Sequence, residues 1–257
     1  MQNALLCTGY GAVDPRPRAD RAAVEAALQA AAPGWAFARA VTSPAMRARM
    51  AQNGLPADSA AQALEKLAAA GCRTVVVQPT NLLYGQDYEA LCAEAAAYAG
   101  KFEHLRVGEP LLACNADLVA AVRAVAEACP PQPGETLLLA GHGAGRFAGV
   151  VYPALQGVFA LQGRQDVLVA VLHGWPALDD VLPALHGTGS RRVHLMPFLL
   201  GAGAHACRDL AGPSPASWQT RLQAAGFTVR CTLQGLGSLP GIQQLYCQKF
   251  KQAAGGL

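Results

Sequence analysis

The sequence predicts an α/β protein made of two similar lobes, each a small parallel sheet flanked by helices. Short apolar runs alternate along the chain with longer Ala- and Leu-rich segments of helical period, which is typical of strand–helix–strand units. The 257 residues are enough for two small lobes with buried cores, and a hydrophobic content of 52% argues against disorder. The two halves of the chain also repeat one another, which indicates a duplicated lobe.

Eight strands and eight helices follow from this pattern. The strands are expected at 4–8, 35–40, 74–78, 105–108, 136–140, 167–172, 193–199 and 228–233. The helices are expected near 19–31, 59–70, 87–99, 115–129, 146–161, 177–186, 217–225 and 240–253. A Pro-Pro-Gln-Pro-Gly cluster at 130–134 is the clearest break. We therefore place an N-terminal lobe at 1–130 and a C-terminal lobe at 131–257, with the last helix free to pack back on the first lobe.

Two pairs of segments carry the internal repeat. Residues 5–12, Leu-Leu-Cys-Thr-Gly-Tyr-Gly-Ala, align with residues 137–144, Leu-Leu-Leu-Ala-Gly-His-Gly-Ala. Residues 73–79 align with 191–197, and both segments end in proline. Continuing that register places Asp87 opposite His205. Each half thus offers a potential ligand after a strand, and we expect the bound molecule in a cleft between the lobes.

Three histidines follow predicted strands of the C-terminal lobe, namely His142, His173 and His205. Ligands of open parallel sheets bind outside the carboxyl ends of the strands, so these side chains are expected at one edge. Imidazole binds Co, Ni, Zn and Fe(II), and three with an open position make a reactive metal site. A packed or capping role for each histidine stays open as the structural alternative. The other three are expected to be structural: His104, His186 and His194.

Composition limits the classes of partner. A net charge of +3 with 14% charged residues is too weak a field to indicate nucleic acid binding. No apolar run approaches the roughly 20 residues of a spanning helix, and the N-terminus resembles a strand more than a signal peptide. The eight cysteines form no Cys-x-x-Cys pair, which argues against a disulfide framework or a structural zinc site. We expect a cytoplasmic protein with no nucleic acid or membrane partner, and the sequence is compatible with a homo-oligomer.

The block Val193-His-Leu-Met-Pro-Phe-Leu-Leu-Gly-Ala-Gly-Ala-His205 and the segment Gly141-His142-Gly143-Ala144 resemble the anaerobic sirohydrochlorin cobaltochelatases of cobalamin synthesis. Further matches cover nearly the whole chain in order, at 4–11, 42–43, 62–64, 85–89, 209 and 217–218. Members of this class II chelatase family have two similar α/β lobes with the tetrapyrrole between them. The resemblance implies insertion of a divalent metal, Co²⁺ before Ni²⁺, Fe²⁺ or Zn²⁺, into sirohydrochlorin or a related tetrapyrrole. The metal is then a substrate, and no organic cofactor is expected.

The resemblance also implies which residues bind the metal. The two metal-binding histidines of the family fall on His142 and His205, which are therefore the expected catalytic residues. The family's third ligand, a glutamate, is replaced by His173. A histidine of some members falls on Asn81, and an acidic residue falls on Asp87. Three neutral imidazoles leave the full charge on the ion and suit Co, Ni or Zn, so we interpret His173 as a retuned ligand.

The macrocycle is expected to contact the Gly-x-Gly-Ala loops of both lobes, because exposed backbone N–H groups and an arginine can hold its carboxylates. The expected substrate-binding residues are Tyr10, Gly11, Ala12, Asn81, Asp87, Gly143, Ala144 and Arg146. Two alternatives remain: an Fe²⁺ or Ni²⁺ chelatase of a related tetrapyrrole pathway, and a non-catalytic tetrapyrrole or metal-binding protein on the same scaffold. A three-histidine zinc hydrolase is disfavoured, since no Asp or Glu directly follows any of the three histidines.

Overall fold

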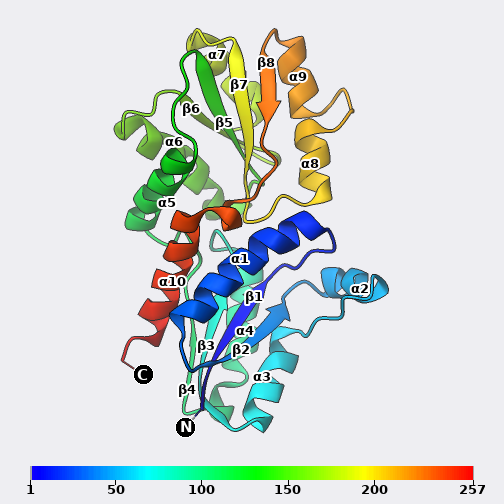
Figure 1. The fold of residues 1–257 in the computed structure, drawn as a ribbon, viewed down its shortest axis with the longest axis vertical. Helices are drawn as coiled ribbons and strands as arrows, with labels where there is room; N and C mark the ends of the chain where they lie inside the picture. Colours follow the sequence, from blue (N-terminus) through cyan, green and yellow to red (C-terminus); the bar gives the residue numbers. More distant parts are fainter. Residues whose placement is uncertain (1, 257) are drawn as a thin grey trace. The chain divides into compact units, whose positions relative to one another are not determined.

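The computed structural model describes residues 2–256, and within that range the side chains of Arg146, Ala204 and His205 lie outside the description. It shows an α/β protein with two parallel four-stranded sheets and helices around each of them (Figure 1), which confirms the predicted fold class. Contacts divide the chain into two compact units. Unit 1 comprises Met1–Ala113 and Ile242–Leu257, and unit 2 comprises Cys114–Gly241.

Both sheets have the same strand order. The strands of unit 1 are β1 (Gln2–Gly9), β2 (Ala36–Val41), β3 (Cys72–Pro79) and β4 (His104–Val107), in the order β2-β1-β3-β4. The strands of unit 2 are β5 (Glu135–Gly141), β6 (Val167–Val171), β7 (Arg192–Phe198) and β8 (Thr228–Cys231), in the order β6-β5-β7-β8. In each unit the first strand in the chain is therefore central and is flanked by the second and the third.

The pairing registers agree with the internal repeat of the sequence. Leu5 of β1 pairs with Val76 of β3, and Leu137 of β5 pairs with His194 of β7. The sequence repeat aligns Leu5 with Leu137 and Val76 with His194. Residues that the repeat makes equivalent therefore also pair with equivalent partners in the two sheets. The two lobes are thus similar in strand order and in the pairing of individual residues.

Helices cover the sheets of both units. Those of unit 1 are α1 (Pro15–Ala31), α2 (Pro44–Gln52), α3 (Ala60–Ala69), α4 (Gln86–Ala96) and most of α10 (Pro240–Ala254). Those of unit 2 are α5 (Asn115–Ala128), α6 (Val151–Leu161), α7 (Leu178–Gly187), α8 (Ala204–Ala211) and α9 (Trp218–Ala224). Three short 3₁₀ segments are η1 (Ala99–Lys101), η2 (Arg146–Val150) and η3 (Leu236–Ser238). No helix among the described residues is long and apolar enough to span a bilayer.

Three helical segments differ from the sequence-based prediction. The prediction omitted α2 and α8, and it made a single helix of 146–161, where the structure has η2 followed by α6.

Two helices, α5 and α10, lie near the limits of the two units. The predicted boundary at 130–131 lies after α5, which contacts α6 of unit 2. In α10, the hydroxyl of Tyr246 donates to the carbonyl oxygen of Thr80 at 2.9 Å, so this last helix packs on unit 1.

Each unit has its own core, because its strands are apolar along most of their length. In unit 1, Leu64 of α3 packs on Val75 and Val77 of β3. In unit 2, Leu185 of α7 and Leu195 of β7 belong to one buried apolar cluster. Parallel strands buried on both faces are continuous apolar runs. Apolar strand interiors leave the strand ends as the places where polar side chains of a site can gather.

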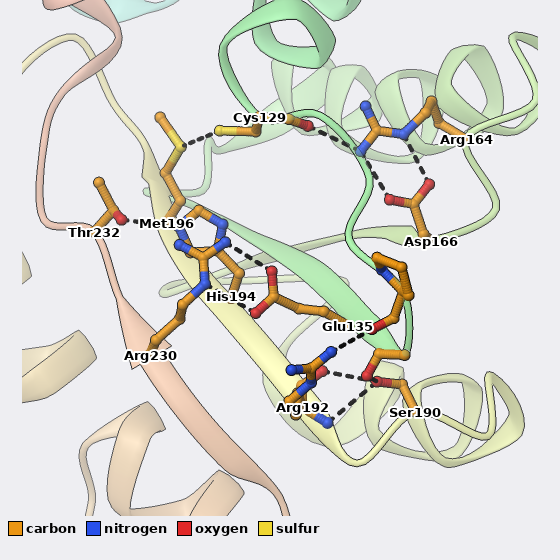
Figure 2. Close-up of polar contacts among 12 residues, drawn as sticks. Cys129, Glu135, Arg164, Asp166, Ser190, Arg192, His194, Met196, Arg230 and Thr232 are labelled. Atoms are coloured by element: carbon orange, nitrogen blue, oxygen red, sulfur yellow. Dashed lines mark hydrogen bonds and ion pairs between the residues drawn. The ribbon is translucent and has the colours of Figure 1, made fainter.

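A polar cluster, shown in Figure 2, joins the start of β5 and the first half of β7 to β8 and the residue that follows it. The guanidinium of Arg230 donates two hydrogen bonds to the carboxylate of Glu135, at 2.8 and 2.7 Å. Nε2 of His194 lies 2.9 Å from the hydroxyl of Thr232, and His194 is only 6% exposed. Burial and the charge of Arg230 lower the pKa of His194, although Glu135 opposes them. His194 is the third residue of β7 and pairs with Leu137, the third residue of β5, so it does not lie at the strand ends that carry His142 and His173.

The lowered pKa of His194 makes stability depend on pH. The unfolded chain takes up the proton near the ordinary histidine pKa of about 6.5, before the folded protein does, so folding loses stability as the pH falls below that value. We expect the free energy of unfolding in urea to drop between pH 7.5 and 5.5, and to drop less in His194→Gln. The exposed His104 supplies the control, since His104→Gln should keep the wild-type pH dependence. Equal pH dependence in wild type and His194→Gln would contradict the prediction.

Candidate metal site

Two of the three predicted metal-binding histidines lie together at the carboxyl edge of the sheet in unit 2. His142 directly follows β5, and His173 follows the neighbouring strand β6 by two residues. Their imidazole rings have centroids 5.1 Å apart and planes inclined by 71°. Both side chains are exposed. Parallel strands end at the same edge, so the sheet itself brings these two residues together.

Backbone hydrogen bonds beyond the strand ends hold the pair in place. The amide of Leu172 donates to the carbonyl of Gly141 at 2.8 Å, and the amide of His173 donates to the carbonyl of His142 at 3.0 Å. Metal–nitrogen distances at histidine sites are about 2.0–2.1 Å, so rings at this separation leave room for one ion that contacts both. The pair is therefore held at a separation at which one ion can contact both rings.

Gly143 has a conformation and a neighbour that other residues would not tolerate. Its φ is +95°, in the left-handed region that favours glycine. A Cβ atom at this position would lie 1.7 Å from the carbonyl oxygen of His173. The loop after β5 thus touches the loop after β6 directly, backbone to backbone. Glycine at this position allows the two histidine-bearing loops to approach so closely.

Tyr152 of α6 supports the same loop, and the sequence analysis did not identify it. Its hydroxyl accepts a hydrogen bond from the amide of Gly143 at 3.2 Å. A Cβ atom on Gly141 would lie 2.2 Å from Cε1 of the Tyr152 ring, so the ring fills the space beside that glycine. Burial raises the pKa of Tyr152, which keeps the phenol neutral. The two glycines around His142 signalled a close neighbour, but nothing in the sequence identified which side chain it is.

His205 and Arg146 are only partly described. His205 was predicted in a loop, and this was wrong, because its backbone forms the second residue of α8. Arg146 begins η2. Both side chains lie outside the described residues, so the third imidazole and the arginine remain predictions. Among the side chains that the structure describes, no group of three or more His, Cys, Asp or Glu is arranged to hold a metal ion.

The predicted residues of unit 1 also follow strands. Tyr10, Gly11 and Ala12 come directly after β1, and the side chain of Tyr10 is exposed. Gly11 has a φ of +89°, and a Cβ atom there would lie 2.7 Å from Cγ1 of Val41. Gly11 therefore resembles Gly143 both in its backbone conformation and in its tight surroundings. The Gly-x-Gly-Ala loops of the repeat share this local structure.

Asn81 and Asp87 lie after β3. Asn81 is half-buried, and its carbonyl oxygen accepts a hydrogen bond from the amide of Leu111 at 3.0 Å. Asp87 is exposed in the first turn of α4, where a carboxylate interacts favourably with the helix dipole. Asp87 is the second residue of α4, as His205 is the second residue of α8. The repeat therefore aligns these two residues in structure as well as in sequence.

Comparison with known proteins gives consistent matches over the whole chain. Residues 3–255 match the sequence model of a family described as cobalt chelatase (CbiK). The sirohydrochlorin cobaltochelatase of Salmonella typhimurium is 32% identical over 256 residues, covering 98% of this chain and 97% of the relative. The sirohydrochlorin cobaltochelatase CbiKC of Nitratidesulfovibrio vulgaris is 33% identical over 229 residues, covering 87% and 79%. The structure of SirB from Bacillus subtilis with Fe³⁺ has a TM-score of 0.70 at 15% identity, covering 99% and 96% of the two chains, and shares the fold.

Proposed function

The chain belongs to the cobalt chelatase (CbiK) family, and on that basis we propose that it inserts Co²⁺ into sirohydrochlorin. The observation that carries the proposal is the pair His142 and His173, whose rings lie 5.1 Å apart at the carboxyl edge of a parallel sheet. The two relatives named sirohydrochlorin cobaltochelatases support the choice of metal and macrocycle. The metal ion is a substrate in this reaction. Ni²⁺, Fe²⁺ and Zn²⁺ are the competing ions for imidazole ligands.

The reaction exchanges two pyrrole N–H protons for one metal ion. A neutral imidazole has one free lone pair, which can bind the ion or accept a proton. We assign both roles to His142 in succession: it holds the ion first, and it accepts a pyrrole proton as the ion moves to the nitrogens of the macrocycle. His173 and His205 hold the ion with it, and His205 accepts the second proton in the same way.

The carboxylates of the macrocycle need donors near the histidines. The amide of Gly143 already donates to the hydroxyl of Tyr152, so we do not assign it to a carboxylate. We assign to Gly143 the role of shaping the loop and contacting the macrocycle. The amide of Ala144 and the guanidinium of Arg146 then bind carboxylates. From unit 1 we assign Tyr10, Gly11, Ala12 and Asn81 to macrocycle binding, with Asp87 as a carboxylate partner of the exchange.

We also propose a cytoplasmic location. All eight cysteines have free thiols, and Cys7 and Cys72 are buried. Free thiols persist in reducing compartments, whereas secreted proteins tend to pair them. Burial raises the pKa of the Cys7 thiol to about 12, so it stays protonated and unreactive.

An absorption assay tests the proposed function. Purified protein is mixed with metal-free sirohydrochlorin and Co²⁺, and the shift of the absorption bands is followed in time. We expect a rate well above that of the same mixture without protein, with repeated turnover. Ni²⁺ and Fe²⁺ run in parallel define the metal preference. No acceleration with any of the three ions would overturn the proposal, and stoichiometric binding without turnover would indicate a carrier.

His173→Glu should change the metal preference while retaining insertion. A carboxylate partly neutralises the ion, and its harder oxygen weakens the preference of imidazole ligands for Ni²⁺ over Co²⁺. We expect the ratio of the Co²⁺ rate to the Ni²⁺ rate to rise about threefold or more. His173→Ala, which supplies no ligand, should lower both rates together. An unchanged ratio in His173→Glu would show that residue 173 does not contact the ion during insertion.

A further inference from the structure

Trp175 has an exposed indole in the loop that carries His173. The exposed fraction of its side chain is 63%, whereas Trp218 is buried in the core of unit 2. The third tryptophan, Trp35, packs edge-on against Phe250 with ring centroids 5.3 Å apart. A single exposed aromatic residue is ordinary on a protein surface, so exposure alone assigns Trp175 no function. Trp175 is nevertheless of interest because it lies two residues after His173 in the chain.

The loop that carries Trp175 is fixed on both sides. The amide of His173 donates to the carbonyl of His142 at 3.0 Å, and the carbonyl of Pro176 accepts from the amide of Val171 at 2.7 Å. Between these bonds, Gly174 has a φ of +103° and turns the chain. Two residues of chain span at most about 7 Å, so Trp175 is held close to His173. The backbone thus holds Trp175, with its exposed indole, within about 7 Å of His173 along the chain.

The chemistry of the reaction explains why an indole should be held there. A tetrapyrrole that takes a metal ion from His142 and His173 must present one broad, flat face to these histidines. An aromatic side chain binds such a surface by offset stacking or by an edge contact. The indole N–H is a donor only, with no lone pair for a metal ion, so Trp175 does not compete with the histidines for the substrate ion.

We propose that Trp175 is a substrate-binding residue that holds the face of the tetrapyrrole against the histidine pair. This inference rests on the proposed chelatase function and names a specific contact within it. Trp175 contributes to macrocycle binding and leaves binding of the metal ion to the histidines. Substitutions should therefore affect the two substrates of the reaction differently.

Steady-state kinetics with sirohydrochlorin and Co²⁺ test this difference. We expect Trp175→Ala to raise the KM for sirohydrochlorin about tenfold, which corresponds to about 1.4 kcal/mol, in the range of one aromatic contact with its buried area. The KM for Co²⁺ and the kcat should stay within about twofold of wild type. Trp175→Phe keeps an aromatic face and should recover most of the loss. Leu161→Ala, at an 89% exposed apolar side chain that ends α6, is the matched control and should leave all three constants unchanged.

A binding measurement without metal separates this inference from the proposed function. Metal-free sirohydrochlorin is titrated into the protein while tryptophan emission is recorded. We expect strong quenching in wild type and clearly weaker quenching in Trp175→Phe, because Trp175 is the emitter next to the macrocycle. A wild-type KM for sirohydrochlorin in Trp175→Ala, with equal quenching in Trp175→Phe, would overturn the inference even if wild type inserts Co²⁺. Trp175-dependent quenching without any insertion would support the inference while the chelatase proposal fails.

Discussion

His142→Ala is expected to lower the rate of Co²⁺ insertion into sirohydrochlorin by about 100-fold or more, toward the spontaneous rate. The variant removes a metal ligand and a proton acceptor at once, and general acid–base catalysis by one side chain contributes about 10²–10⁴-fold. His142 is exposed, and its ring packs against another exposed ring, that of His173. Substitution at such a position changes stability by no more than about 0.5 kcal/mol, so the loss of rate should occur in a folded protein.

A control variant and a binding measurement show whether the loss of rate is specific to His142. His104→Ala removes an exposed histidine from the first residue of β4 in unit 1 and should keep the wild-type rate. Titration with Co²⁺ alone, followed by visible absorption, should show weaker binding in His142→Ala and unchanged binding in His104→Ala. A wild-type rate in His142→Ala would place the chemistry elsewhere in the protein. A lost rate with unchanged Co²⁺ binding would assign His142 to proton transfer alone.

The strands were predictable because burial on both faces gives them a simple pattern. Val75, Val76 and Val77 of β3 are fully buried, and such runs of apolar residues mark buried strands directly. The predicted and observed ends of all eight strands differ by no more than two residues. The repeat added the equivalence of the two lobes, because it aligned Leu5 with Leu137, and both residues lie at equivalent places in their sheets.

The two omitted helices have physical reasons. Helix α2 buries none of its residues, so it has no apolar face whose period would indicate a helix. Only its start carries a signal: the hydroxyl of Ser43 accepts from the amide of Met46 at 3.2 Å, and Pro44 follows as the first helical residue. Helix α8 has eight residues and follows a Gly-Ala-Gly segment at 201–203, which favoured a loop in the prediction.

In the candidate site, only the residues that the sheet topology brings together were predictable. The rule that ligands bind at the carboxyl ends of parallel strands brought His142 and His173 together in advance. The contribution of Tyr152 was not predictable, since its contact with Gly143 depends on how α6 packs against the sheet. The close approach of Gly143 to His173 is a contact between two loops that are thirty residues apart in the chain, and no local pattern encodes it.

Gly143→Ala should lower both the stability of the protein and the insertion rate. An alanine with left-handed φ costs about 1–2 kcal/mol, and overpacking adds about 1–3 kcal/mol. The new Cβ atom would lie 1.7 Å from a backbone oxygen of His173, so one of the two histidine-bearing loops must move. For a chain of this size we expect the Tm to fall by roughly 5–15 °C. A displacement of about 1 Å at reacting groups costs about 100-fold in rate, so insertion should also fall by about that factor.

Gly145→Ala is the matched control for this loop. Gly145 has a φ of −77°, and a Cβ atom there has no heavy atom within 4 Å among the described residues. Alanine at such a position restricts the unfolded chain and should leave the Tm unchanged or raise it slightly. Measuring the rate well below the Tm of Gly143→Ala separates displaced histidines from unfolded protein. If Gly143→Ala keeps the wild-type rate at that temperature, the contact between the two loops does not position the histidines, and the sheet alone is sufficient to do so.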